Sequence, residues 1–294
     1  MQAAMPEGKA AAKAAGGLIE KDKADALPAG KPLGRIGSLE VRLARDEAEI
    51  AAAQQVRYRV FYEELGAKKG ASRADRSDAD QFDHICDHLV VIDTSLSGAA
   101  HRRIVGTYRL LRQEQALAAG GFYSESEFEL PKLIARHPDR RFLELGRSCV
   151  LPQYRSKRTI EVLWQGIWAY INHYGIGVMT GCASFPGTEP EAHAEALAYL
   201  AHHCRAEKAW DVRAVPGRYH SMKLMPVGEV NAKEAIAAMP PLIKGYLRLG
   251  ARIGDGCVVD NDFSTVDVFV VLPVSQIAER YISYYGADGQ HCAA

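Results

Sequence analysis

The stretch FLELGRSCVLPQYRSKRTIEVLWQGIWAYI, residues 142–171, decides the fold. Residues 142–150 have the composition of a strand, which ends at Pro152, and a polar loop follows. The apolar residues beyond the loop recur at spacings of three, one, three and four: Ile160, Leu163, Trp164, Ile167 and Ile171. This spacing places them in one stripe along a helix. We therefore expect a strand, a loop and a helix that packs on a sheet.

The loop between this strand and this helix is basic. Arg155, Lys157 and Arg158 crowd the start of the helix, where the helix dipole disfavours cations unless an anion is bound. Ser156 or Thr159 can cap the helix and leave its first amide groups pointing outward. A strand, a loop and a helix N-terminus in this order form a phosphate site, although an ordinary solvated turn is the alternative.

Strands and helices alternate on both sides of this stretch. A strand pattern covers 38–44, and Asp46 with Glu49 forms a capping-box pattern that starts a helix over about 47–65. Further strands are expected at about 88–93, 103–111, 177–184, 257–260 and 266–272, and further helices at about 190–204 and 240–250. The sequence predicts an α/β fold, with a mixed central sheet flanked by helices in one domain over 38–294.

Length and composition are those of an ordinary globular protein. The 294 residues are 48% apolar and 24% charged, and Lys plus Arg balance Asp plus Glu at 36 each. A zero net charge provides no global field for wrapping nucleic acid, so no nucleic-acid partner is expected. The longest apolar run, Val268–Val274, is far shorter than the ~18 residues of a membrane span. Scattered cysteines and the lack of a secretory signal favour a cytoplasmic protein.

The first 37 residues differ from the rest of the chain. They hold Ala, Gly and Lys with two prolines and few large apolar residues. Such a segment cannot offset the entropy of ordering, so residues 1–37 are expected to form a flexible, disordered tail. A basic arm that touches anionic lipid is the alternative.

Two further patterns suggest chemistry only weakly. His84, Cys86 and His88 alternate as strand ligands of zinc would, but no distal pair completes a tetrahedral set, so no metal is expected. Cys149 could act as a nucleophile with a His partner, yet no nucleophile motif surrounds it.

The segment Val150-x-Pro-x-Tyr154-Arg155, followed by a helix, resembles the acyl-donor loop of the GNAT N-acyltransferase superfamily. Where that family has small residues, which let backbone amides approach the pyrophosphate of coenzyme A, this chain has Arg158 and Ile160. Bulky residues suit a single phosphate on a pantetheine arm instead. The resemblance thus implies acyl carrier protein as the donor, a phosphopantetheine thioester as the carried group and no bound cofactor. The implied donor-binding residues are Val150, Arg155, Ser156, Lys157, Arg158 and Thr159.

Other segments resemble two families within this superfamily. RYRVFYEELG, Asp80, Asp83, GTYRLL and ELGR follow the order of the acyl-homoserine-lactone synthases, which are shorter. The blocks CDHLVV, GFYSESEF, LELGRSCV, GCASFPGTEP, PPLIKGYLRLGA and GDGCVVDNDF resemble instead the ornithine N-acyltransferases of bacterial ornithine-lipid synthesis. The second resemblance covers roughly 38–285. It implies a GNAT-like fold and transfer of a 3-hydroxyacyl chain from acyl carrier protein to the α-amine of L-ornithine, which forms lyso-ornithine lipid.

Aminolysis of a thioester needs a neutral amine, an acceptor for its proton and donors for the oxyanion. By analogy with the GNAT family, strand 142–150 lies against the reacting carbonyl, so Glu144 is the expected general base, directly or through water. A bulge at Gly146 would bring Arg147 to the same face and make both residues catalytic. A buried structural ion pair is the alternative.

Five further residues are candidates for binding the substrate: Arg57, Phe61, Asp80, Asp83 and Arg109. The two carboxylates suit the ammonium groups of a diamino acid, or they cap turns. The two arginines suit the substrate carboxylate, orient Asp83, or form structural salt bridges. Phe61 belongs to a set of aromatic residues that suit an acyl tunnel.

Two other functions remain open at the level of the sequence. The shared pattern also fits an autoinducer synthase that uses S-adenosylmethionine, although the greater length and residues 186–263 argue against it. A lipid-binding or membrane-perturbing protein is the third reading. The product of ornithine acylation is an amphiphile, which is compatible with peripheral attachment to the inner face of the cytoplasmic membrane, but no anchor is encoded.

Overall fold

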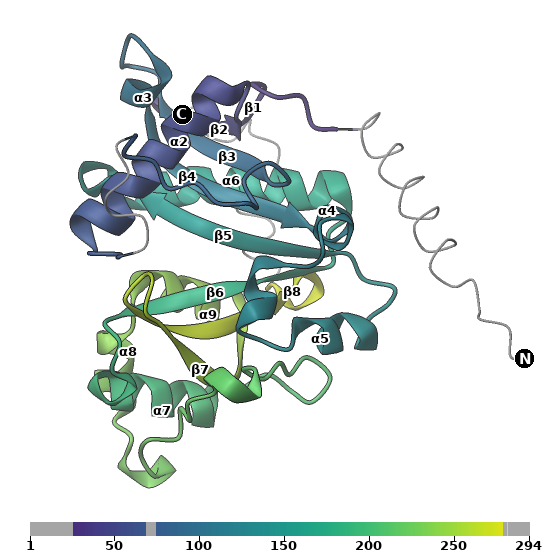
Figure 1. The fold of residues 1–294 in the computed structure, drawn as a ribbon, viewed down its shortest axis with the longest axis vertical. Helices are drawn as coiled ribbons and strands as arrows, with labels where there is room; N and C mark the ends of the chain where they lie inside the picture. The colour runs from purple at the N-terminus through teal and green to yellow at the C-terminus, as the bar shows by residue number, and fades with distance from the viewer. Residues whose placement is uncertain (1–25, 69–74, 279–280, 282–294) are drawn as a thin grey trace, which may run out of the picture.

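The computed structural model describes residues 26–68, 75–278 and 281. Eight strands form one sheet in the order β1-β2-β3-β4-β5-β6-β8-β7 (Figure 1). The strands are β1 (Pro32–Ile36), β2 (Leu39–Leu43), β3 (Asp87–Asp93), β4 (Ile104–Arg112), β5 (Phe142–Val150), β6 (Val178–Pro186), β7 (Arg252–Asp260) and β8 (Thr265–Pro273). Neighbouring strands are antiparallel except β5 and β6, which are parallel. The predicted mixed sheet is confirmed.

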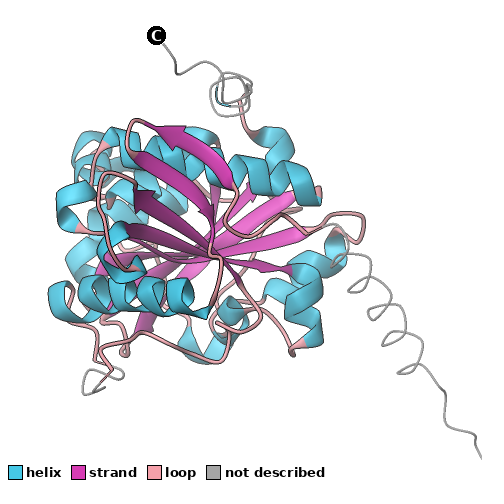
Figure 2. Ribbon diagram, turned by 90° about the horizontal axis from the view of Figure 1, so that it is seen from above, coloured by secondary structure: helices cyan, strands magenta, loops and turns pink. Residues whose placement is uncertain are grey.

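Helices surround this sheet, as the view from above shows (Figure 2). They are α2 (Glu47–Tyr58), α3 (Ala100–Arg103), α4 (Gln113–Ala118), α5 (Leu130–Arg136), α6 (Lys157–Tyr174), α7 (Ala194–His203), α8 (Ala232–Ala238) and α9 (Pro241–Leu249). Helices α2 and α6 lie on opposite faces of the sheet (Figure 1). Within the described ranges, no helix combines the length and the apolar character that a membrane span needs.

The helix of the deciding stretch, α6, packs on strands β1 to β3. Leu163, Ile167 and Ile171 of the predicted stripe are buried, whereas Ile160 is half exposed and does not belong to it. A Cβ at Gly166 would lie 2.7 Å from a methyl carbon of Val41. Glycine at this position therefore allows the helix to approach β2 closely.

The helix predicted over 47–65 begins as expected. The side chain of Asp46 accepts a hydrogen bond from the backbone N–H of Glu49 at 3.0 Å, which satisfies one of the free amides of the first turn. After Tyr58 the helix continues as a π-helix, η1 (Arg59–Glu64). This segment carries Phe61, which packs against the main core.

The N-terminal boundary differs from the prediction. Residues 1–25 of the expected tail lie outside the described residues, but Pro32–Ile36 form strand β1, which pairs with β2. Leu33 and Ile36 pack against the main core. The expectation of a tail to residue 37 is wrong for this part, because backbone pairing and two apolar side chains stabilise a short edge strand that composition does not reveal.

The sheet divides between β5 and β6. These strands pair only at Phe142 with Val178, Leu143 with Met179 and Glu144 with Thr180. Beyond this point β5 continues along β4 and β6 continues along β8, and the two strands separate (Figure 1). At the point of separation, a Cβ on Gly181 would lie 2.4 Å from the carbonyl oxygen of Leu145, so only glycine permits this approach.

Candidate active site

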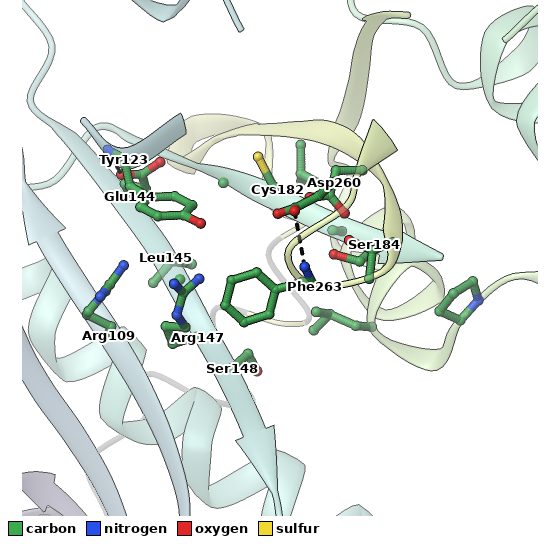
Figure 3. A pocket seen from close by; sticks show the side chains of 18 of the residues that line it. Arg109, Tyr123, Glu144, Leu145, Arg147, Ser148, Cys182, Ser184, Asp260 and Phe263 are labelled. Carbon is green, nitrogen blue, oxygen red and sulfur yellow. Dashed lines mark hydrogen bonds between the residues drawn. The ribbon is translucent and has the colours of Figure 1, made fainter. Parts of the chain in front are cut away.

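The division of the sheet opens a cavity of about 420 Å³, within the ordinary size range of small-molecule sites. One wall is β5 from Glu144 to Ser148, and the other is β6 from Met179 to Pro186. Figure 3 shows Arg147 and Phe263 near its centre, with Glu144 and Tyr123 on one side and Cys182, Ser184 and Asp260 on the other. Of the residues predicted for the site, Phe61, Arg109, Glu144 and Arg147 line this cavity.

A bulge in β5 turns Arg147 toward the cavity. Thr107 pairs with Cys149 and Arg109 pairs with Gly146, so two residues of β5 oppose the single residue Tyr108. The bulged residue is Arg147 itself, with φ of 50°, in the left-handed region that few non-glycine residues adopt. A bulge was predicted at Gly146; it lies one residue later, and it does bring Glu144 and Arg147 to one cavity.

Arg147 is held by charges and rings. Its Nε lies 3.2 Å from Oδ2 of Asp78, and its Nη2 lies 3.0 Å from Oδ2 of Asp80. The guanidinium also stacks over the rings of Tyr123, at 4.8 Å, and Phe263, at 4.4 Å. Burial opposes its charge, but Tyr123, Asp78 and Asp80 raise its pKa above the ordinary value. Arg147 is therefore a fixed cation at the centre of the cavity.

Glu144 is buried with its carboxylate on backbone donors. The N–H of Tyr123 donates to Oε2 at 2.8 Å, and the N–H of Ser124 donates to Oε1 at 2.9 Å. Both amides belong to the 3-10 helix η2 (Tyr123–Ser126). Burial raises the pKa of Glu144, and these hydrogen bonds oppose the rise. A carboxylate oxygen accepts more than one hydrogen bond, so Glu144 is able to accept another from a group in the cavity.

The predicted substrate-binding carboxylates pair with arginines. Arg57, fully buried, lies 2.6 Å from Oδ1 of Asp83 and 2.8 Å from Oδ2 of Asp78. Arg109 lies 2.6 Å from Oδ1 of Asp80. Arg57 holds the pKa of Asp83 well below its usual value although burial acts in the opposite direction. Arg57 thus orients Asp83, which was one of its predicted roles, and neither Asp80 nor Asp83 lines the cavity.

The predicted donor loop carries less free charge than its sequence indicates. Arg155 forms a two-point ion pair with Glu64, at 2.6 and 2.7 Å, and its Nε donates to the carbonyl of Val150 at 3.0 Å. Glu64 directly precedes Leu65, which lines the cavity. The loop therefore lies beside the cavity opening, and its first arginine is neutralised by an acid far away in the sequence.

The remaining donor-loop residues divide between two roles. Ser156 caps α6 and accepts from the N–H of Thr159 at 3.3 Å. Thr159 is buried and donates to the carbonyl of Tyr154, so of the two predicted caps Ser156 is the one observed. Lys157 is exposed and lies 3.4 Å from Glu161. Arg158 is exposed, and it forms no ion pair with another described residue.

A further side of the cavity, formed by α9 and by aromatic side chains, is apolar. Helix α9 contributes Tyr246 and Leu242, and the hydroxyl groups of Tyr246 and Tyr108 lie 3.2 Å apart. Phe61 packs edge-on against Phe263, with ring centroids 5.9 Å apart. Leu242 and Leu65 line the cavity while they remain 37% and 55% exposed. The cavity thus has an apolar opening to the surface.

A cluster of buried acids, which sequence analysis missed, also lies at the cavity. The carboxylate oxygens of Glu127, Asp260 and Asp267 lie within 4.8 Å of one another, and Asp260 and Asp267 line the cavity. Burial and the charge of Asp267 raise the pKa of Glu127 to about 7, and burial raises that of Asp267 to about 6. Glu127 and Asp260 stand in the blocks GFYSESEF and GDGCVVDNDF, which carried the family resemblance without indicating a role for either acid.

The weaker sequence patterns lie apart from this cavity. Nε2 of His88 is buried 2.9 Å from the carbonyl oxygen of Asp83, and burial lowers the pKa of this imidazole. Burial also raises the pKa of Cys149 to about 12. A buried thiol of this pKa is not a thiolate at neutral pH, so it is a poor nucleophile.

Known proteins resemble this chain over most of its length. A GNAT acetyltransferase domain model matches residues 56–165. The L-ornithine N(alpha)-acyltransferase of Agrobacterium fabrum is 60% identical, over 87% of this chain and 88% of that protein. The protein of the same name from Brucella abortus is 60% identical, over 87% of this chain and 92% of that protein. Among solved structures, the AHL synthase LasI aligns with a TM-score of 0.46 and 12% identity, over 85% of this chain and 96% of that chain.

Proposed function

This chain belongs to the L-ornithine N(alpha)-acyltransferases, and on that premise we propose that it transfers a 3-hydroxyacyl chain from acyl carrier protein to the α-amine of L-ornithine. The product is lyso-ornithine lipid. That the chain is an acyltransferase follows from relatives that are 41 to 60% identical and share this name. The carrier protein, the hydroxyacyl group and the residue roles below are parts of the proposal.

The observation that carries the proposal is the cavity between β5 and β6. Its apolar wall and exposed leucine rim suit an acyl chain, and Glu144 and Arg147 line the same cavity. Backbone groups of β5 that lose their partners where the sheet divides are able to hydrogen-bond a pantetheine arm and the oxyanion. A thioester and an amine therefore meet between an acid and a fixed cation.

The donor-loop residues support a carrier protein. The pair formed by Arg155 and Glu64 lies beside the cavity opening, and Lys157 and Arg158 are exposed at the start of α6. Exposed cations suit the acidic surface of a carrier protein and steer its approach. The N-terminus of α6 suits the phosphate of the arm.

The residues of the cavity suit the chemistry of aminolysis. The α-nitrogen attacks the thioester carbonyl, the carbon–sulfur bond breaks, and the proton of the amine passes to Glu144, directly or through water, and then to the leaving thiolate. Arg147 holds the α-carboxylate of ornithine, because a planar guanidinium matches a carboxylate. Arg109 supports this site through Asp80, which pairs with both arginines.

Two other expectations have narrower support. An autoinducer synthase would share the fold, but the relatives at 58 to 60% identity are ornithine acyltransferases, so we do not propose it. We extend the proposal to peripheral attachment at the inner face of the cytoplasmic membrane, because the exposed Leu65 and Leu242 open the cavity where an amphiphilic product would leave.

The test combines purified protein, a 3-hydroxyacyl carrier protein and L-ornithine. We expect release of free thiol that depends on ornithine, and a product whose fragmentation mass spectrum places the acyl group on the α-nitrogen. Thiol release only with acyl-CoA would remove the carrier protein from the proposal. A product acylated on the side-chain nitrogen would remove the assigned acceptor atom.

A further inference from the structure

The buried acid cluster has more negative charge than the protein neutralises. Glu127 has one cationic partner, with Nη2 of Arg218 at 3.2 Å. Asp260 accepts from the backbone N–H groups of Asp262, at 2.7 Å, and Phe263, at 3.1 Å. Three carboxylates thus share one guanidinium among the described residues.

Asp267 provides the second observation. It is only 6% exposed, and Ser184 and Thr265 act on its carboxylate as hydrogen-bond donors, but its Oδ1 has no hydrogen-bond partner in the described part of the chain. An unpaired buried carboxylate oxygen is costly. Asp267 lines the cavity, so its carboxylate lies at the cavity wall. The missing partner of Oδ1 is a hydrogen-bond donor, and a cationic donor suits a site with three carboxylates.

The cluster lies next to the proposed base. Sγ of Cys182 is 3.4 Å from Oε2 of Glu127, and the charges of Glu127, Asp267 and Glu144 all act on this thiol, whose pKa burial raises well above its usual value. Cys182 therefore lies close to both Glu144 and the cluster. Figure 3 shows Cys182 between Glu144 and Asp260. A short aliphatic chain that crosses Cys182 would join a group at Glu144 to a group at the cluster.

We propose that Glu127, Asp260 and Asp267 bind the side-chain ammonium group of the acceptor and so select a diamino acid. This inference rests on the proposed function, since it assigns the second amine of the same substrate. Asp80 and Asp83, the predicted ammonium ligands, are paired with arginines and do not line the cavity. The cluster holds the side-chain amine charged and away from the thioester, while the α-amine lies at Glu144.

The experiment compares L-ornithine with L-norvaline, which has the same carbon chain but no side-chain amine. We expect the wild-type protein to prefer ornithine by about 100-fold or more in kcat/KM, since a site left with unpaired polar groups rejects the analogue strongly. Asp267→Asn is expected to lower kcat/KM for ornithine by about 10- to 100-fold, mainly through KM, and to leave norvaline unchanged or improved. Asp262→Asn changes an exposed acid in the turn between β7 and β8; it is the matched control and should change neither.

Calorimetric binding of ornithine without any acyl donor separates this inference from the proposed function. Binding that weakens in Asp267→Asn supports the cluster as the ammonium site even if no acyl transfer occurs. Equal rates with ornithine and norvaline in the wild-type protein would overturn the inference, and this comparison needs no variant. Equal losses with both substrates in a folded Asp267→Asn protein would overturn it as well. Stabilisation by Mg²⁺ or Ca²⁺ that depends on Asp267, with ornithine binding unaffected, would identify a metal site instead.

Discussion

Replacement of Glu127 by glutamine should stabilise the protein above neutral pH. In the folded protein the pKa of Glu127 is about 7, against an ordinary value of 4.5, because of burial and the charge of Asp267. A carboxyl group whose folded-state pKa is raised contributes stability that is complete below pH 4.5 and is lost as the pH rises through 7. Glutamine does not titrate, so Glu127→Gln avoids this loss.

The size of the gain follows from the same shift. A rise from 4.5 to about 7 corresponds to about 3 kcal/mol at 1.36 kcal/mol per pKa unit. The opposing attraction of Arg218 is already contained in this shift, so it is not subtracted again. The gain at pH 8 is therefore about 3 kcal/mol, which raises Tm by about 6 °C in a chain of this size.

Thermal unfolding followed by circular dichroism at pH 5 and at pH 8 measures this difference. We expect Tm of Glu127→Gln to exceed that of the wild-type protein clearly at pH 8 and only slightly at pH 5. Asp267→Asn should shift Tm in the same direction, because the two acids titrate as a pair. On this explanation, the negative charge of this cluster lowers the stability of the protein and is retained for binding. An equal rise of Tm at both pH values, or a lower Tm of the variant at pH 8, would refute it.

Three other variants test the remaining parts of the site. Glu144→Gln should lower kcat by about 100-fold or more, as loss of a general base does, with an unchanged circular dichroism spectrum; turnover near the wild-type rate would exclude Glu144 as the base. The double change Lys157→Glu and Arg158→Glu should raise KM for the carrier protein but not for ornithine, whereas a change in Tm alone would indicate a structural role. Gly181→Ala places a Cβ 2.4 Å from the carbonyl oxygen of Leu145 and should cost about 1 to 3 kcal/mol in the free energy of unfolding, measured by urea denaturation; an unaltered midpoint would mean that the division of the sheet adapts freely.

Patterns local in the sequence predicted most of the sheet and its main helices. The alternation over 38–44, the capping pattern at Asp46 and the apolar stripe after Ser156 each depend on neighbouring residues. Each appears in the structure at the expected place, except that Ile160 lies outside the stripe. Strand β1 was missed because its pairing with β2 uses backbone groups, which leave no trace in composition. The bulge of β5 was predicted at Gly146 but lies at Arg147, whose φ is 50°. Glycine is the residue expected in this left-handed conformation, but the ion pairs of Arg147 with Asp78 and Asp80 stabilise it here.

The site was predicted less completely, because its charges pair over long sequence separations. Arg155 lies in a basic loop, yet its partner Glu64 is on η1. Asp83 was a candidate for binding an ammonium group of the substrate, yet its carboxylate pairs with Arg57. Glu127 directly follows η2 and Asp267 lies on β8, and only the fold brings their carboxylates within 4.8 Å of each other. No spacing rule links such residues, so the fold must be known before their roles are assigned.

The most direct test is a crystal structure with L-ornithine and a non-hydrolysable acyl-pantetheine analogue. We predict that the arm lies between β5 and β6, that the α-nitrogen faces Glu144, and that the side-chain nitrogen contacts Oδ1 of Asp267. An arm bound on another surface, with the space between β5 and β6 empty, would contradict the account.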